Sequence, residues 1–416
     1  MFPTRNTQYP GRDFINWKDL EPRLGLVYDV FGNGKTAARV TVNKYMNGLG
    51  LNGLATDGNP VNAIATSTTR AWTDGNGNYV PDCNLLDAAS QNNLATGGDL
   101  CGAMSNAAFL TGVPQASFSN DLLTGWGHRG YNWEFSASVQ QQITPRVSVD
   151  VAYFRRVFGN FRIIDNTLTA ASDYSRYSVT APVDSRLPGG GGYTVGGLYD
   201  VNPNKFGQVS NLNQLDSEID ANQFQHWNGV DFTSRVRLRD GLISGGVATG
   251  RQTTDNCEVA AIIPEVSLTA SQDFCHQDQS MQTQVKFFGT YTLPRIGVLV
   301  AATFQNMPGP PVTAAVTYTN AQIAPSLGRN LSGNAPNASI NVVKPQTMYG
   351  ERLNQLDLRF GKLLRFNKIR MTPSLDIYNA LNGDTVLTES SQFANWRYAQ
   401  SLLTARFVKF SLQFDY

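Results

Sequence analysis

Four cysteines and one run of acidic and amide residues are the side chains whose types and spacing could support chemistry. The cysteines form two pairs, Cys83 with Cys101 and Cys257 with Cys275, each in a polar stretch without strand character. This spacing predicts two disulfides, each worth about 3 kcal/mol by closing a loop, and an oxidising compartment. A zinc site is the alternative, but neither pair has the spacing of zinc ligands, and only His276 lies beside a cysteine.

A weak calcium site is the second candidate. Its ligands would come from the stretch DGNGNYVPD: Asp74, Asn76, Asn78 and Asp82. Oxygen ligands alternate in this way along calcium loops, but Tyr79 replaces the usual Gly and Leu85 the bidentate Glu. An ordinary Asn- and Gly-rich turn leading into Cys83 is therefore favoured, and no other cofactor is predicted.

No pattern of residues indicates an enzyme. Three histidines, His128, His226 and His276, lie near strand ends or in loops without a nucleophile beside them, and no G-x-S-x-G or H-E-x-x-H motif occurs. Asp216 and Glu218 could form a glycosidase pair, but the polar loop around them offers nothing to raise the pKa of either group. The stretch GNGKT lacks the upstream glycine of a phosphate-binding loop.

Composition favours a β-rich protein without a nucleic-acid partner. Charged residues make up 16% of the chain and aromatic residues 11%, with 38 glycines, a profile of strands separated by turns. The formal charge of +1 lacks the basic excess that nucleic-acid binding requires. No apolar run reaches the roughly 20 residues of a membrane helix, and the N-terminal stretch shows no secretory signal. We expect either a cytoplasmic protein or a piece of a longer exported chain.

Alternation of apolar and polar residues with period two recurs along the chain. In the final stretch RFVKFSLQFDY, one apolar row holds Val408, Phe410, Leu412, Phe414 and Tyr416. Similar stretches are joined by connections of two to five residues, as where YNWEFSASVQQ precedes RVSVDVAYF. Such pairs predict β-hairpins.

Long connections alternate with these short turns. They cover approximately residues 47–130, 159–223, 252–281, 307–348 and 380–402. Alternation places every short turn at one end of the sheet and every long loop at the other, as in outer-membrane barrels with short periplasmic turns and long extracellular loops. We predict an all-β fold, an antiparallel up-and-down transmembrane β-barrel over residues 23–416, with 1–22 as a lead-in or loop remnant.

The strand count predicts an incomplete barrel. Eleven strands run from RLGLVYDV to the terminus, whereas bacterial single-chain barrels close with an even number, so strands are missing or one was not recognised. The last strand ends on the short-turn side, which predicts a periplasmic C-terminus. Six strand-borne aromatic residues are expected at the membrane interfaces: Trp133, Phe135, Tyr153, Tyr291, Phe414 and Tyr416.

Several stretches resemble the C-terminal part of the barrel of TonB-dependent outer-membrane receptors. They are FINWKDLEPRLGLVYDVFGNGKTAARVTVNKY, GYNWEFSASVQQQITPRVSVDVAYFRRVFGNF, GERLNQLDLRFGKLLRF, LDIYNALN and ARFVKFSLQFDY. More narrowly, they are similar to receptors with an N-terminal carboxypeptidase-regulatory-like domain, a kind common in acidobacteria. The resemblance covers nearly the whole chain from about residue 16. It implies a barrel of about 22 strands plugged by an N-terminal domain, of which this chain would be the latter half.

The resemblance also implies a function and partners. Loops and plug would capture a nutrient of the oligosaccharide, siderophore or peptide class, and TonB would then drive rearrangement of the plug. Implied partners are outer-membrane lipid, the barrel-assembly machinery through the C-terminal strand, and plug and TonB through a part outside this sequence. Tyr193 and Tyr199, in a Gly-rich segment expected to be flexible, are candidate ligand contacts.

Two other functions stay open. The chain could be a self-contained porin-like or adhesive outer-membrane barrel of about 12 strands, an even number. It could also be a secreted all-β binding protein whose hairpins form a sandwich or propeller. In that protein the apolar rows, including Trp133, Phe135, Val149 and Val151, would have to be buried.

Overall fold

An antiparallel sheet of long strands dominates the structure, a computed structural model that describes residues 14–49, 54–57, 59, 67–105, 109, 117–267, 270–366 and 369–415. Eleven long strands follow one another as an up-and-down meander. They are β2 (Arg23–Asp29), β3 (Thr36–Met46), β9 (Tyr131–Thr144), β10 (Val147–Gly159), β15 (Phe224–Leu238), β16 (Gly241–Asp255), β18 (Gln282–Leu293), β19 (Val298–Met307), β22 (Leu353–Lys362), β24 (Ile369–Tyr378) and β27 (Phe407–Asp415). Two short strands extend the sheet: β17 (His276–Asp278) and β23 (Leu364–Phe366).

The remaining elements lie outside this sheet. The short strands are β1 (Asn16–Lys18), β4 (Trp72–Thr73), β5 (Gln91–Asn92), β6 (Leu100–Cys101), β7 (Ser117–Phe118), β8 (Thr124–Trp126), β11 (Arg162–Asn166), β12 (Tyr174–Thr180), β13 (Thr194–Val201), β14 (Asn211–Leu215), β20 (Ala315–Thr319), β21 (Asn337–Asn341), β25 (Val386–Glu389) and β26 (Ala399–Leu402). The α-helices are α1 (Leu54–Asp57), α2 (Asn120–Leu123), α3 (Cys257–Ile262) and α4 (Asn320–Leu327). No described helix is both long and apolar enough to traverse a membrane.

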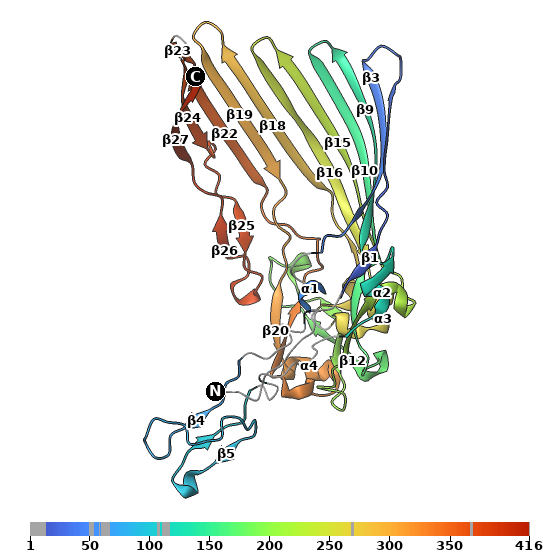
Figure 1. The fold of residues 1–416 in the computed structure, drawn as a ribbon, viewed down its shortest axis with the longest axis vertical. Helices are drawn as coiled ribbons and strands as arrows, with labels where there is room; N and C mark the ends of the chain where they lie inside the picture. The colour runs from blue at the N-terminus through green and yellow to red at the C-terminus, as the bar shows by residue number, and fades with distance from the viewer. Residues whose placement is uncertain are drawn as a thin grey trace.

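The sheet is a partial barrel, which confirms the predicted all-β, antiparallel up-and-down fold and the count of eleven strands. Short hairpin turns lie at one end, and the long connections gather in a folded mass at the other (Figure 1). Within the described residues, β2 pairs only with β3, and β27 pairs only with β24. The sheet therefore has two open edges and does not close on itself.

The first hairpin turn shows why its sequence turns there. Gly32 and Gly34 adopt φ values of 67° and 70°, which side chains with a Cβ rarely adopt. The Gly34 amide donates to Asp29 Oδ2 at 2.7 Å. The stretch GNGKT is thus a turn between β2 and β3.

Cross-strand pairing places the apolar rows on one side, which we call the apolar face. Residues directly opposite each other in neighbouring strands point to the same side of a sheet. One continuous row of direct partners runs through Tyr28, Ala38, Val139, Val151, Phe232, Val247 and Val285. A second row runs through Tyr291, Val300, Phe360, Leu375 and Phe410. Nothing in the described structure covers this face, and Phe232 and Phe410 are 45% and 81% exposed.

The long connections build a domain of their own, which we call the cap. Its main hydrophobic core draws buried side chains from three connections that are distant in sequence: Tyr177, Val179 and Leu198 from the second, Val316, Ile323 and Ile340 from the fourth, and Trp396 from the fifth. Trp396 is 1% exposed, and its Nε1 donates to the Thr313 carbonyl at 2.9 Å. The three connections therefore pack as one body.

Helix α4 shows how local sequence supports the cap. The Gln322 side chain accepts the Thr319 backbone N–H at 2.9 Å, which satisfies one donor at the helix start. Gly328, at φ 78°, ends the helix by donating to the Ala324 carbonyl. Ile323 and Leu327, four residues apart, are buried in the cap core.

Both predicted disulfides are present. Cys83 bonds Cys101 beside the small sheet of β4, β5 and β6, and Cys257 at the start of α3 bonds Cys275. Each bridge closes a loop at the long-loop end, far from the short turns. This placement confirms the sequence interpretation that the cysteines staple loops, and the described residues contain no free cysteine.

Candidate ligand-binding surfaces

The polar face, opposite the apolar face, carries ion pairs between neighbouring strands. Arg359 on β22 and Asp376 on β24 are direct partners, and Arg359 Nη2 donates to Asp376 Oδ2 at 3.0 Å. Arg156 and Glu134 pair in the same way across β10 and β9. Charges of this kind suit contact with water or polar protein rather than lipid.

A hollow of about 460 Å³ lies on the polar face near the long-loop end of the strands. Its lining mixes aromatic rings with charged and amide groups: Phe154, Phe158, Trp227, Glu134, Arg156, Asp231 and Gln252. Flat rings bordered by hydrogen-bonding groups are the usual equipment for holding a small molecule. This hollow is the strongest candidate for ligand contact on the wall.

Two glycines position the Trp227 ring. Gly229 and Gly250 are direct partners on β15 and β16. A Cβ on either residue would overlap the indole of Trp227. The glycines therefore allow the ring to lie against the wall, a recurrent reason for glycine inside a strand.

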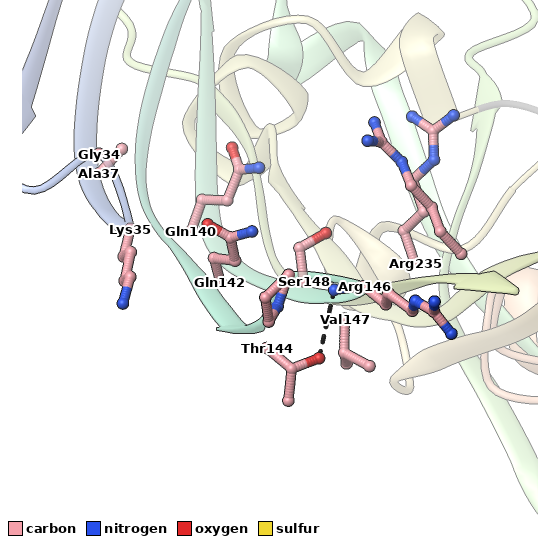
Figure 2. Close-up of a pocket in the computed structure, with 12 residues that line it drawn as sticks. Gly34, Lys35, Ala37, Gln140, Gln142, Thr144, Arg146, Val147, Ser148 and Arg235 are labelled. Atoms are coloured by element: carbon pink, nitrogen blue, oxygen red, sulfur yellow. Dashed lines mark hydrogen bonds between the residues drawn. The ribbon is translucent and has the colours of Figure 1, made fainter. Parts of the chain in front are cut away.

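A second hollow, of about 310 Å³, lies at the short-turn end (Figure 2). Polar groups and four basic residues line it: Lys35, Arg146, Arg235, Arg237, Gln140, Gln142, Thr144 and Ser148. Lys35 points away from Arg235, so the cations do not converge on one point (Figure 2). The drawn hydrogen bond, from the Arg146 amide to Thr144 Oγ1 at 3.3 Å, belongs to the hairpin turn.

A third hollow, of about 360 Å³, lies where the cap meets β9. Trp17 Nε1 donates to the Leu122 carbonyl at 2.9 Å, and the Arg129 guanidinium lies 5.2 Å from the Trp17 ring centroid. These contacts hold β1 against β8, with which it pairs in parallel. These contacts indicate a structural role, which is to hold β1 of the lead-in segment in place.

Two cap tyrosines have strongly raised pKa values. Burial, with the nearby charge of Asp200, raises the pKa of Tyr177 to about 12. Burial, with Tyr193 close by, raises the pKa of Tyr318 to about 12, and the Tyr318 hydroxyl donates to the Thr180 carbonyl at 3.0 Å. Both phenols stay protonated at neutral pH, and the Tyr318 hydroxyl is a fixed hydrogen-bond donor within the cap.

The Gly-rich segment 187–203 is ordered, which corrects the expectation of a flexible loop. Leu187 is buried, and β13 pairs with β12. The Tyr193 hydroxyl donates to the Val342 carbonyl at 2.9 Å, and the Tyr199 hydroxyl donates to Gln272 Oε1 at 2.5 Å. This segment is held by packing against the other connections, which its own composition does not predict. Ligand contact by Tyr193 and Tyr199 stays a prediction.

The candidate calcium residues lie together in an exposed turn. Asp74 accepts the backbone amides of Gly77 and Tyr79 at 2.7 and 2.9 Å, and Asp82 Oδ2 accepts Asn78 Nδ2 at 3.1 Å. The described residues hold no group of three or more His, Cys, Asp or Glu side chains arranged for a metal ion. Calcium binding by Asp74, Asn76, Asn78 and Asp82 stays a prediction.

Asp99 organises the same loop, and sequence reasoning missed it. This buried carboxylate accepts the Asp82 amide at 2.8 Å, Trp72 Nε1 at 3.0 Å and the Gly75 amide at 2.9 Å. These hydrogen bonds, that from Asp82 first, lower the pKa of Asp99. Its position two residues before Cys101 was the available signal.

Strand-borne aromatic residues lie on the apolar face, but not all near strand ends. Phe135, Tyr291 and Phe414 are exposed there, and Trp133 stacks on Phe135 with ring centroids 6.2 Å apart. Tyr153 differs from expectation: β10 continues to Gly159, so Tyr153 lies mid-strand. Tyr416 lies outside the described residues. The interface role of these residues stays a prediction.

Asp216 and Glu218, the acid pair considered for a glycosidase, have surroundings that differ from the expected polar loop. Burial raises the pKa of Asp216, although the sequence suggested no such cause. Glu218 Oε2 accepts the Leu215 amide and Ser119 Oγ, each at 2.7 Å, and so holds the turn. The structure thus gives Glu218 a structural role within this pair.

Comparison with solved structures returns outer-membrane receptors and transporters. The outer membrane transporter YddB from Escherichia coli is 12% identical over 94% of this chain, with a TM-score of 0.45. The ferripyoverdine receptor of the outer membrane of Pseudomonas aeruginosa is 9% identical over 94%, with a TM-score of 0.43. The siderophore receptor PirA from Acinetobacter baumannii is 9% identical over 95%, with a TM-score of 0.39.

This chain spans only part of each of those proteins: 39%, 32% and 40% of their lengths, respectively. No family model matches the sequence, and no curated protein matches it. From its own strand order, register and loops, the chain is an open up-and-down β-barrel wall of eleven long strands that carries a folded cap at one end.

Proposed function

We propose that this chain is a wall segment, with the attached ligand-capturing cap, of a TonB-dependent receptor for nutrient uptake across an outer membrane. One observation carries the proposal. Rows of apolar side chains continue from strand to strand across the eleven strands with nothing in the described structure covering them, while the long connections lie at one end of the strands. Water disfavours such a face, whereas a bilayer accommodates it.

The open edges favour a segment of a larger barrel over a self-contained porin-like one. β2 and β27 each leave one row of backbone groups unpaired among the described residues. Unpaired backbone in the hydrocarbon region costs several kcal/mol per group, so further strands must close the wall. Those strands, the plug and the contact with TonB would come from a part of the protein outside this chain.

The cap and the polar-face hollow would share ligand capture. The cap joins three connections through one hydrophobic core. A ligand that orders one connection would therefore stabilise the positions of the other two. Beneath it, Trp227 and its polar neighbours supply stacking and hydrogen bonds. The proposed orientation places the cap outside the cell and the short turns in the periplasm. Ligand candidates are oligosaccharides, siderophores and peptides.

Uptake by cells that produce the full-length protein tests the proposal. Radiolabelled ligands of the three classes are added to cells that carry the protein in their outer membrane, with and without TonB. We expect saturable uptake of one class that disappears without TonB. Non-saturable entry of small solutes that is independent of TonB would instead indicate a porin-like barrel.

A matched pair of variants on β15 separates the two faces. Trp227→Ala removes the ring on the polar face and is expected to weaken uptake at limiting ligand, because contact of the ligand with the indole ring is lost. Phe232→Ala changes the apolar face of the same strand and should leave uptake unchanged. Equal effects of both substitutions would contradict a ligand role for the hollow.

A further inference from the structure

Basic side chains interrupt the apolar face near the long-loop end. Four of them, which we call the basic girdle, are Lys44 on β3, Arg155 on β10, Arg251 on β16 and Arg352 just before β22. At the opposite end of this face Lys362 is basic, and its Nζ donates to the Ile296 carbonyl. All four residues lie in, or for Arg352 next to, the parts of their strands that lead to the long connections.

The register places two of these cations in one row. Phe135, Arg155, Asn228 and Arg251 are direct partners across four neighbouring strands. Arg155 and Arg251 are separated by one strand, hence by roughly 10 Å along the sheet. Arg155 Nη1 donates to Asn228 Oδ1 at 3.0 Å, and the Tyr153 hydroxyl donates to the same oxygen at 2.9 Å.

Neither arginine forms an ion pair with a carboxylate within the described part of the chain, although the charge of Arg251 acts on Asp278. The nearest acids on this face, Asp255 and Asp278, bind the two nitrogens of His276 at 2.8 and 3.2 Å. Asp278 Oδ1 also accepts the Thr253 hydroxyl at 2.7 Å. Arg251 makes no hydrogen bond or ion pair with any described residue. Most donors of both guanidinium groups therefore stay available.

The other two girdle cations sit among aromatic and amide groups. Lys44 Nζ lies 4.4 Å from the Tyr131 ring centroid and 5.9 Å from that of Trp133. Arg352 Nε donates to Asn306 Oδ1 at 3.2 Å, and Asn306 faces Val285 on the apolar face. Aromatic rings beside basic residues are typical of the depth at which lipid headgroups begin.

We propose that the basic girdle binds the phosphate groups of anionic lipid headgroups in the leaflet on the cap side. The inference rests on the proposed membrane location of the wall. Arg155 and Arg251 present unpaired guanidinium donors, whose planar geometry suits phosphate oxygens. The carbon stems lie along the apolar face while the charged groups reach the headgroup level. The girdle thereby sets the depth of the wall in the bilayer.

Lipid retention by the full-length protein tests this. Protein reconstituted in equal mixtures of phosphatidylglycerol and phosphatidylcholine is analysed by native mass spectrometry for the lipids that stay bound. We expect severalfold preference for phosphatidylglycerol in the parent protein. The double variant Arg155→Gln/Arg251→Gln should lose most of this preference, because one basic residue at an anionic surface contributes about 1 kcal/mol, or about fivefold.

Three controls give each outcome a meaning. The Arg155→Lys/Arg251→Lys variant should keep most of the preference, and Arg235→Gln/Arg237→Gln on the polar face should keep all of it. An equal loss in the polar-face variant, or displacement of the lipid by millimolar inorganic phosphate, would overturn the inference. Insertion without headgroup preference would refute the girdle alone, whereas failure of the parent protein to insert would refute the proposed function as well.

Discussion

Replacing Trp396 with Ala should loosen the cap without unfolding the wall. The indole is 1% exposed within a core shared by three connections. Truncating a buried Trp to Ala costs about 3–5 kcal/mol. About 1 kcal/mol of this comes from the hydrogen bond to the Thr313 carbonyl. A further ~0.5–1 kcal/mol comes from the Arg186 guanidinium, which lies 5.4 Å from the ring centroid.

Hydrogen exchange followed by mass spectrometry measures this effect. A loss of about 3 kcal/mol corresponds to roughly 150-fold faster exchange through local opening. We expect it in β12, β13, β20 and β21, whose residues share the core, and not in β15 or β16. Leu402→Ala, on an exposed position of the same connection, is the control and should change exchange little.

Two results would refute the reasoning. Unchanged exchange in β12 and β20 would show that the connections do not pack as one body. Equally accelerated exchange in the wall strands would show that the cap and the wall unfold together. Trp396→Phe, which keeps most of the apolar area and loses the Nε1 hydrogen bond, should give an intermediate rate.

Three further predictions concern the staples, one histidine and the apolar face. Replacing Cys83 and Cys101 with Ser should lower the stability of the loop they close by about 3 kcal/mol and expose it to proteinase K, with wall fragments intact on a gel. The hydrogen bonds to Asp255 and then Asp278 raise the pKa of His276, so β17 should be most stable below about pH 6.5, the value in the unfolded chain. Its protection should fall as pH rises through the raised pKa, and His276→Gln should remove this dependence in exchange experiments. Phe232→Arg should destabilise the reconstituted protein by about 2–4 kcal/mol in denaturant titrations, whereas Thr233→Arg on the polar face of the same strand should cost far less.

Period-two patterning was sufficient to predict the wall. Val151 and Phe232 alternate with polar neighbours in their own strands, and the structure pairs them directly. Because a one-residue slip would move every side chain to the other face, such patterning also specifies register. The end of β10 at Gly159 agrees with the predicted start of the second long connection, although Arg155 interrupts the apolar row of this strand.

The cap could not be predicted from local sequence. Its core joins Leu198, Ile323 and Trp396 from three separate connections, and nothing near any one of them indicates its distant partners. The Gly-rich stretch 187–203 looked flexible for the same reason, since its order comes from contacts with residues such as Val342. The cysteine pairs were predictable because each pair is local. The hollow around Trp227 depends on Gly250, which only the strand register brings beneath the ring.

Lipid accessibility along one strand tests the central claim most directly. Spin labels are placed singly at Val230, Asp231, Phe232 and Thr233 on β15 of the full-length protein in vesicles. Relaxation by oxygen, which concentrates in the bilayer, is then compared with relaxation by a water-soluble nickel complex. The account predicts oxygen-dominated relaxation at 230 and 232 and nickel-dominated or slow relaxation at 231 and 233. Equal relaxation at all four positions, or nickel-dominated relaxation at 230 and 232, would contradict a membrane wall.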